Sequence, residues 1–265
     1  MNMNENISLS TAAFFPRDIA EIISLANSVG VKTLELMPQD ISECTPEFAL
    51  EIKRIDPNMW IYSVHFPLVL LQFFFNPHPR ARKTGEQISR NLIAMAADLD
   101  TRIIVMHSPR KEKGTPVFRD ISIEHIRYLC DLAAEKDIKI AIENNPGSET
   151  SQPDDLMAFI KELDRDNLNI VVDTTESMEA GVNPEDFLRN IPRVDHLHVS
   201  DFSDQGKHLP LGRGVIDWAT IVKLMKQKKY PGKWVIELSY RHLLKNAQAT
   251  LQESVNILSQ LLNNA

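Results

Sequence analysis

The sequence predicts an α/β protein that folds as one (β/α)8 TIM barrel domain over residues 1–265. Three observations lead to this prediction. Short β-rich segments alternate with amphipathic helical segments, which indicates a parallel sheet with right-handed crossovers. Eight such units fill the chain, whose length is close to the about 250 residues typical of a barrel. The turn after the first predicted strand, AAFFPRD, has none of the glycines that form the phosphate-binding turn of an open doubly wound sheet.

The eight predicted strands are short runs of aliphatic and β-branched residues, and each is followed by a segment with apolar residues three or four positions apart. They are Ile7–Ala12, Lys32–Met37, Trp60–Phe66, Arg102–His107, Lys139–Glu143, Leu168–Asp173, Val194–Val199 and Lys233–Leu238.

The intervening segments carry helix signals. Pro16–Gly30 opens with proline and closes with glycine, the usual asymmetry of a helix. Thr84–Asp100 and Ile121–Asp137 are amphipathic in the same way. Gln152–Asp164 has acidic residues in its first turn, where the helix dipole favours them. A long amphipathic helix is expected at the end of the chain, from about His242 to Leu262.

Composition narrows the class of protein. The chain is 43% hydrophobic and 25% charged, as in ordinary globular proteins, and its net charge of -7 argues against a nucleic-acid partner. Cys44 and Cys130 are far apart and are expected to be reduced thiols. The N-terminus lacks a signal-peptide pattern, and the most apolar run, Phe66–Phe75, is too short to span a bilayer. We therefore expect a cytoplasmic protein without a membrane partner.

Polar residues close the predicted strands on one face. Alternate side chains of a strand point in opposite directions, so Ala141 and Glu143 share a face, opposite Ile140 and Ile142. The bulky aliphatic face suits the surrounding helices, and the polar face then points into the barrel at the carboxyl end, where barrel enzymes keep their chemistry. The same parity places seven polar side chains at this rim: Glu35, His65, His107, Glu143, Asp173, His198 and Glu237.

Single members of this set have ordinary structural explanations, such as a cap or a solvated residue for Glu35. A core position is favoured for the neighbouring His196. Seven titratable groups together, however, incur desolvation and like-charge repulsion, which a divalent cation would relieve. One divalent ion (Mn²⁺, Co²⁺, Mg²⁺ or Zn²⁺) is expected, and an oxygen-rich set with one imidazole favours the first three over a closed structural zinc site. The donors from the last four strands are Glu143, Asp173, His198 and Glu237.

These strand ends resemble the xylose isomerase-like barrel superfamily, especially its sugar (phosphate) isomerases and epimerases, over essentially the whole chain. The motifs that carry the resemblance are HFP at His65–Pro67, MHSP at Met106–Pro109, IEN at Ile142–Asn144, VVDT at Val171–Thr174, LHVSD at Leu197–Asp201, PLGRGVIDW at Pro210–Trp218 and IEL at Ile236–Leu238.

The resemblance implies that the same four donors hold the cation and that Glu143 and Glu237 also form the acid–base pair. It implies that the substrate, a small sugar or sugar phosphate, loses a proton next to a carbonyl and passes through an ene-diolate. Return of the proton to the same carbon gives epimerisation, and return to its neighbour gives isomerisation; both stay open. The residues expected to contact substrate are His65, His107, Glu176, His208 and Arg213.

Two positions depart from the epimerase pattern: Glu176 stands where a histidine is common, and Asp204 where an arginine is common. Glu176 is either an exposed loop residue or a carboxylate that recruits a second cation or a cationic substrate. An endonuclease IV-like enzyme that cuts abasic DNA is an alternative, but Gly206 replaces an aspartate of its Asp-x-His motif. A catalytically silent barrel that binds a metabolite or partner is the alternative outside enzymes.

Three loop segments have open interpretations. Leu68–Phe75 is a lid, a homodimer contact, or a short helix folded over the barrel mouth. The run with Arg110, Lys111, Lys113 and Arg119 is solvated surface charge or a phosphate dock. In Pro210–Trp218, Gly212 and Gly214 permit a turn, Arg213 contacts substrate or braces a carboxylate, and Asp217 is expected to be a helix N-cap.

Overall fold

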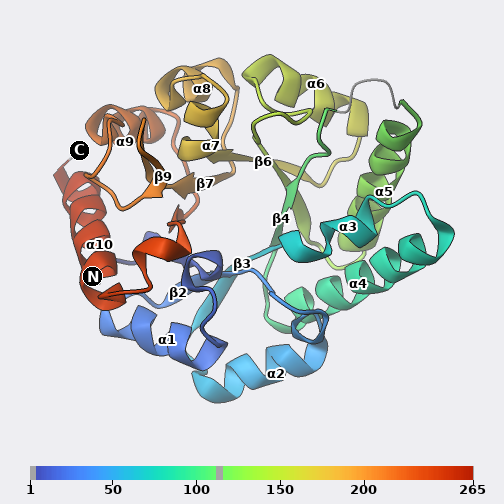
Figure 1. Ribbon diagram of the computed structural model, residues 1–265, viewed down its shortest axis with the longest axis horizontal. Helices are drawn as coiled ribbons and strands as arrows, with labels where there is room; N and C mark the ends of the chain where they lie inside the picture. The colour runs from blue at the N-terminus through green and yellow to red at the C-terminus, as the bar shows by residue number, and fades with distance from the viewer. Residues whose placement is uncertain (1–3, 112–115, 265) are drawn as a thin grey trace.

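The computed structural model describes residues 4–111 and 116–264, and eight parallel strands in it close into a barrel (Figure 1). The strands neighbour one another in the order β1-β10-β7-β6-β5-β4-β3-β2. Their bounds are β1 Ile7–Ser10, β2 Thr33–Leu36, β3 Trp60–His65, β4 Ile103–His107, β5 Lys139–Glu143, β6 Leu168–Asp173, β7 His196–Val199 and β10 Trp234–Ile236. The predicted fold class is confirmed, and each predicted strand segment contains one barrel strand.

The helices form an outer ring around the barrel (Figure 1). Several of them begin with proline, whose fixed φ and missing N–H suit the first helical position. The long helices are α1 Ile19–Ser28, α2 Pro46–Ile55, α4 Pro79–Asp98, α5 Pro116–Ala134, α6 Pro153–Leu163, α8 Pro184–Asn190, α9 Trp218–Gln227 and α10 Ala247–Asn264. The short ones are η1 Thr11–Phe14, η2 Ile41–Glu43, η3 Leu68–Leu70, α3 Leu71–Phe74, α7 Thr174–Glu179 and η4 Tyr240–His242.

Several predicted boundaries are wrong. The helices α4 and α5 start at Pro79 and Pro116 rather than at Thr84 and Ile121. The last helix starts at Ala247 rather than near His242, because residues 240–242 form a separate 3-10 turn. The last barrel strand ends at Ile236, so Glu237 lies one residue beyond it. The amide of Glu237 still donates a hydrogen bond to the carbonyl of Val199 (3.2 Å), which keeps this residue aligned with β7.

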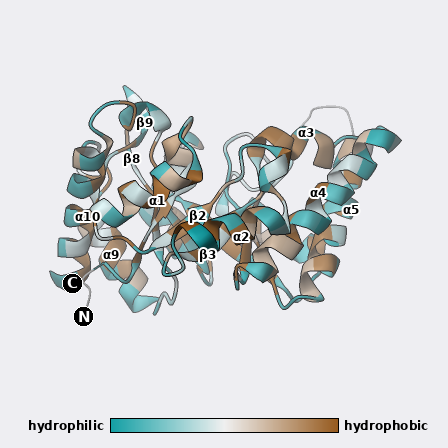
Figure 2. Ribbon diagram, turned by 90° about the horizontal axis from the view of Figure 1, so that it is seen from below, coloured by the Kyte–Doolittle hydropathy of each residue, from teal (hydrophilic) through white to brown (hydrophobic). Residues whose placement is uncertain are grey.

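A short antiparallel hairpin, β8 (Asp201–Ser203) and β9 (Gly206–Leu209), follows β7 and was not predicted from the sequence. In the side view of Figure 2, this hairpin and α3 both stand on the upper side of the molecule. The hairpin brings His208 to the carboxyl end of the barrel, as described below.

The barrel wall separates two apolar clusters, which confirms that alternate side chains of a strand point to the helices and to the barrel interior. Ile140 and Ile142 belong to the large apolar cluster that also contains residues of the surrounding helices. Val105, Ala141 and Val171, from three neighbouring strands, form a separate small cluster. One face of each strand therefore supports the helices, and the other fills the barrel interior.

Two predictions from composition can be compared with the fold. Cys44 and Cys130 are buried free thiols, and burial raises the pKa of each to about 12. These thiols are therefore poor nucleophiles. Within residues 4–111 and 116–264, no helix combines the length and the apolar character needed to cross a membrane.

Candidate metal centre

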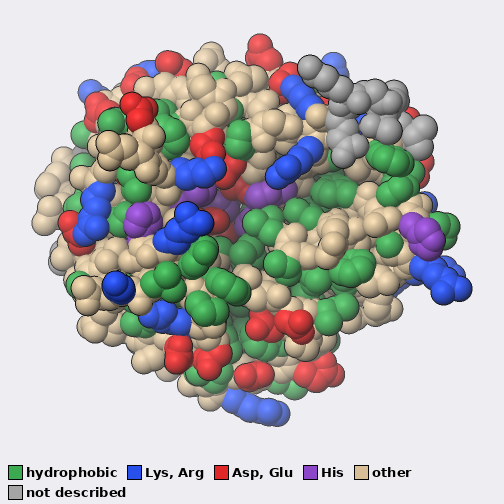
Figure 3. Space-filling view, viewed as in Figure 1, with side chains coloured by type: hydrophobic (Ala, Val, Ile, Leu, Met, Phe, Trp, Pro, Cys, Tyr) green, Lys and Arg blue, Asp and Glu red, His purple; other side chains and the backbone are tan. Residues whose placement is uncertain are grey.

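Four predicted donor residues converge at the carboxyl end of the barrel. His198 Nδ1 lies 2.8 Å from Glu143 Oε1, 3.1 Å from Glu237 Oε2 and 3.9 Å from Asp173 Oδ2. Glu143 ends β5 and Asp173 ends β6. His198 lies in β7, and Glu237 directly follows β10. Histidine and acidic side chains meet near the centre of the face shown in Figure 3. The structure therefore brings together the four residues that the sequence singles out.

Carboxylate oxygens of this cluster are buried without a hydrogen-bond partner in the part of the chain that the structure describes. Asp173 Oδ2 and Glu237 Oε2 find no hydrogen-bond partner among the residues described. A buried carboxylate oxygen without a partner is unfavourable by several kcal/mol unless a cation or a proton compensates it. Ligand atoms of Glu143, Asp173 and His198 all lie within 4.8 Å of one another. Three carboxylates and one imidazole fit a divalent cation in both chemistry and spacing.

Glu35 lies behind His198 and is fully buried. Its Oε1 is 3.0 Å from His198 Nε2, and its Oε2 accepts hydrogen bonds from Ser63 Oγ (2.8 Å) and His196 Nε2 (2.8 Å). Glu35 is thus neither a helix cap nor a solvated residue and points into the barrel as strand parity predicts, and the core position of His196 is confirmed. With Nε2 facing Glu35, His198 presents Nδ1 to the other three donors. A carboxylate behind a ligating histidine is the usual way to fix its ring and tautomer.

The charges of the cluster shift the pKa values of its members. Burial raises the pKa of Glu143, but His198 and His107 outweigh it and hold this pKa well below its usual value. Burial lowers the pKa of His198, but Glu35, Glu143 and Glu237 raise it well above its usual value. For Asp173, burial outweighs the opposing charge of nearby His208 and raises the pKa to about 8. Without a bound cation, therefore, protons on His198 and Asp173 offset the negative charge of the cluster.

His65 and His107 both contact the second oxygen of Glu143. His107 Nε2 lies 2.8 Å from Glu143 Oε2 and His65 Nε2 lies 3.4 Å from it. His65 is 1% exposed, and Glu143 raises its pKa to about 9 against the effect of burial. The side chain of His107 is 23% exposed and lines a large cavity. The geometry thus gives His107 access to that cavity, while the predicted substrate contact of the buried His65 stays a prediction.

Glu176 and His208 form a pair at the edge of the cluster. His208 Nε2 lies 3.2 Å from Glu176 Oε1, and His208 Nδ1 lies 3.3 Å from the carbonyl oxygen of Glu237. Burial lowers the pKa of His208, but Asp173 and Glu176 raise it to about 10. The amide of Glu176 also donates to Asp173 Oδ1 (2.7 Å), which caps α7 and turns Oδ2 of Asp173 toward the cluster. Glu176 is therefore not a free loop carboxylate.

Arg213 points away from the cluster. It forms an ion pair with Glu253 on α10, and its side chain is 50% exposed. Its predicted contact with substrate therefore stays a prediction. Asp217 does cap its helix as expected, accepting a hydrogen bond from the amide of Thr220 (3.1 Å).

Asp201 explains the PLGRG turn and was missed by sequence reasoning. Its Oδ2 accepts from the amide of Gly212 (3.0 Å) and from Trp218 Nε1 (3.2 Å). A Cβ at Gly214 would lie 2.2 Å from Asp201 Oδ1, so only glycine fits there. The turn is thus built around a buried carboxylate, and its Gly212 donor is already satisfied rather than free for a phosphate. The sequence signal was the aspartate that ends LHVSD.

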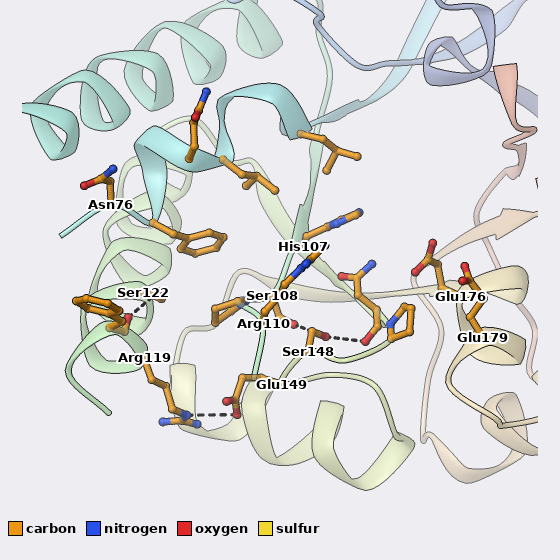
Figure 4. Close-up of a pocket in the computed structure, with 18 of the residues that line it drawn as sticks. Asn76, His107, Ser108, Arg110, Arg119, Ser122, Ser148, Glu149, Glu176 and Glu179 are labelled. Atoms are coloured by element: carbon orange, nitrogen blue, oxygen red, sulfur yellow. Dashed lines mark hydrogen bonds and ion pairs between the residues drawn. The ribbon is translucent and has the colours of Figure 1, made fainter. Parts of the chain in front are cut away.

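A cavity of about 1060 Å³ adjoins the cluster (Figure 4). His107 and Glu176 lie at its inner end, next to the donor residues. The predicted loop Leu68–Phe75 is folded into the short helices η3 and α3, which form one wall of the cavity. The structure therefore agrees with the short-helix interpretation of this loop, and neither a lid motion nor a dimer contact is tested by it.

The basic run after β4 is mostly neutralised. Arg119 forms ion pairs with Glu162 (2.6 Å) and Glu149 (3.2 Å), and Lys111 pairs with Asp155 (2.6 Å). Lys113 lies outside the described residues. These pairs favour surface charge over a phosphate dock for Arg119 and Lys111.

The comparisons with known proteins agree with this architecture. A family model described as "Xylose isomerase-like TIM barrel" matches residues 23–261. The uncharacterized protein MJ1188 of Methanocaldococcus jannaschii is 24% identical over 251 residues, covering 91% of each chain. An inosose dehydratase of Yersinia enterocolitica is 22% identical over 258 residues, covering 84% of this chain and 82% of that protein.

Solved structures share the fold at low sequence identity. A D-tagatose 3-epimerase-like protein superposes with a TM-score of 0.75 and 22% identity, covering 96% of this chain and 98% of the other. The structure of the IOLI protein with a bound zinc atom has a TM-score of 0.75 and 14% identity, covering 98% of both chains. At these identities the superpositions support the barrel fold alone.

Proposed function

The chain belongs to the xylose isomerase-like TIM barrel family, and we propose that it is a divalent-metal-dependent isomerase or epimerase of a sugar or sugar phosphate. The observation that carries the proposal is the convergence of three carboxylates on His198 Nδ1, with oxygens of Asp173 and Glu237 that lack a hydrogen-bond partner in the described part of the chain. The names of the similar proteins support the reaction class, since they include a D-tagatose 3-epimerase-like protein and inosose dehydratases. The zinc of the IOLI structure supports the metal requirement.

The residues proposed to hold the cation are Glu143, Asp173, His198 and Glu237. A bound divalent cation would polarise a substrate carbonyl and stabilise the negative charge that develops when the neighbouring C–H loses its proton. The choice among Mn²⁺, Co²⁺, Mg²⁺ and Zn²⁺ stays open, because the oxygen-rich donor set suits all but a closed zinc site.

Proton transfer is assigned to Glu143 and Glu237. Glu143 is ionised because His198 and His107 hold its pKa low, so it is ready to accept a proton. Glu237, with a side chain 17% exposed, is the most accessible of the four donors. Both carboxylates lie within 3.1 Å of the same imidazole nitrogen, so a substrate seated at this point is within reach of both. One removes the proton and the other returns it.

Dehydration is the second candidate reaction. Two curated relatives are named inosose dehydratase and another is named 3-dehydroshikimate dehydratase. Such a reaction begins with the same proton removal next to a carbonyl and continues with loss of a hydroxyl from the adjacent carbon. The same acid–base pair serves both reactions, so the product rather than the site distinguishes them.

A screen in heavy water tests this proposal. Ketoses, aldoses, keto-inositols, their phosphates and keto-glycosides are incubated with the protein and Mn²⁺, Co²⁺ or Mg²⁺. We expect metal-dependent deuterium uptake at the carbon next to the carbonyl for at least one compound. An isomeric product of unchanged composition indicates isomerisation or epimerisation, whereas a product that has lost one water indicates dehydration. Absence of deuterium uptake with every compound and metal would contradict both reactions.

A further inference from the structure

The cavity beside the metal centre is larger than a single sugar needs. Its volume of about 1060 Å³ is at the upper end of the about 300–1,000 Å³ range of pockets that enclose drug-sized ligands. It runs from Glu176 and His107 at the inner end to Asn76 and Arg119 at the outer end (Figure 4). The proposed donor residues account only for the region next to its inner end.

An unpaired amide faces this cavity. Asn145, two residues after Glu143, lines the cavity and is only 7% exposed. Neither its Nδ2 nor its Oδ1 has a hydrogen-bond partner in the part of the chain that the structure describes. A buried amide without partners is unfavourable, and it offers two donors and one acceptor. This combination is suited to neighbouring hydroxyl groups of a bound ligand.

The loop that carries Asn145 is fixed by other side chains. Ser148 Oγ donates to the carbonyl of Asn145 (2.7 Å), and Thr150 Oγ1 donates to the carbonyl of Glu143 (2.6 Å). Ser108 Oγ joins this network at 2.9 Å from Ser148 Oγ and 2.8 Å from Thr150 Oγ1. The Asn145 amide is therefore held in place without taking part in the network, which leaves it available to a ligand.

Part of the cavity lining is apolar. Leu68 and Leu71 from the short helices after β3 line it, as does Phe118 from α5. Leu68 is 39% exposed and Phe118 is 41% exposed, so the mouth of the cavity presents uncovered apolar surface. The guanidinium of Arg110, which also lines the cavity, makes no ion pair within residues 4–111 and 116–264. Apolar surface together with hydrogen-bonding groups matches a ring that has flat C–H or aromatic faces and polar edges.

We propose that this cavity is a second subsite that binds a ring attached to the reacting sugar. The substrate is then a keto-glycoside, in which a sugar ring that carries a ketone is joined through oxygen to a second ring, rather than a free monosaccharide. The inference rests on the proposed function, since the reacting sugar occupies the metal centre. Phe118 and Leu71 pack on the second ring, and Asn145 binds the polar groups at the edge of that ring.

Calorimetric binding to the Mn²⁺-loaded protein tests the subsite without requiring turnover. The ligands are matched series of gluco-, galacto- and xylosides in both anomers, each as the methyl glycoside, the 4-nitrophenyl glycoside and a disaccharide. We expect at least one series in which a second ring strengthens binding by tenfold or more. In Phe118→Ser and Asn145→Ala this advantage should fall to threefold or less, with methyl glycoside binding unchanged. Leu50→Ser, at an exposed leucine on α2, is the matched control and should keep the full advantage.

Two results would overturn the subsite: no series shows an advantage for the second ring, or the advantage survives in both variants. The heavy-water screen separates this failure from failure of the proposed function. A protein that exchanges deuterium into free sugars but shows no second-ring advantage retains the function and lacks the subsite. A protein that binds second rings but exchanges deuterium into no sugar or glycoside retains the subsite and lacks the function.

Discussion

At the scale of single residues, the account depends on two glutamates that share one histidine. Replacing Glu143 or Glu237 with glutamine keeps the volume of the side chain but removes its ability to accept a proton. We expect deuterium exchange into substrate to fall about 10²–10⁴-fold in each variant, the range attributed to general acid–base catalysis. Glu185→Gln, at an ion pair with Arg189 on α8, is the control and should leave exchange unchanged. Full exchange in both active-site variants would exclude the proposed pair and assign the proton transfer to other residues.

Glu35 gives a separate prediction, because it contacts His198 from the side opposite the other donors. Glu35→Gln leaves the cation with all four proposed donors but weakens the contact that fixes the His198 ring. Such changes behind a ligating histidine typically weaken metal binding about 10–100-fold, and we expect a loss of this size for Mn²⁺ by calorimetry. Ser63→Ala, which removes one hydrogen bond to Glu35, should have a smaller effect. Equal affinity in Glu35→Gln and wild type would contradict this role.

The sequence pointed to the proposed donor residues but not to the residues that support them. Strand parity identified Glu143, Asp173 and His198, because alternation along a strand is a local property. The role of Glu35 could not be predicted, since its partner His196 lies 161 positions away and only closure of the barrel brings them together. Asp201 was missed for the same reason: its contacts to Gly212 and Trp218 depend on how the loop folds back.

At the scale of elements, the apolar wall of the cavity depends on how closely α3 approaches α4. Gly85 on α4 permits this approach, because a Cβ there would lie 2.7 Å from the carbonyl oxygen of Phe73. Gly85→Ala should push α3 outward and destabilise the protein by about 1–3 kcal/mol, as overpacking commonly does. Urea denaturation measures this loss. Gln87→Ala, at an exposed site on the same helix, is the control and should leave the free energy of unfolding nearly unchanged. If Gly85→Ala also left it unchanged, α3 would be free to move away from α4.

The eight barrel strands were predictable because long alternation of strand and helix signals constrains the topology strongly. The β8–β9 hairpin was not, since its strands, Asp201–Ser203 and Gly206–Leu209, carry no apolar alternation. This hairpin nevertheless positions His208 against Glu176 and the Glu237 carbonyl. The most irregular element of the rim thus completes the site.

At the scale of the whole molecule, the titrating cluster predicts how pH changes stability. His65 and His208 have pKa values of about 9 and 10, and Asp173 has one of about 8, all above their usual values. The folded state therefore holds protons that the unfolded chain releases at lower pH, and this stabilisation is lost as pH rises through about 8–10. We expect the Tm of chelator-treated protein to fall by several degrees between pH 7 and pH 10. Mn²⁺ should largely remove this fall, and a Tm that rises with pH would contradict the shifts.

The overall charge and the rim residues also argue against a nuclease. The chain has a net charge of -7, and Gly206 stands where the Asp-x-His motif of an endonuclease IV-like site has its aspartate. Glu176 is engaged by His208. We expect no nicking of an abasic duplex above background with Zn²⁺, Mn²⁺ or Mg²⁺ in a gel assay. Metal-dependent nicking that disappears in Glu143→Gln would reverse this conclusion.

The central claim is that Glu143, Asp173, His198 and Glu237 share one cation, and metal titration of the chelator-treated protein tests it most directly. With Mn²⁺ in a calorimeter, we predict one ion per chain and an affinity that falls at least tenfold in both Asp173→Asn and His198→Ala. His196→Ala, next to the cluster but outside the donor set, should weaken binding less than either variant. Absence of Mn²⁺ binding, or an affinity unchanged in both donor variants, would contradict the account.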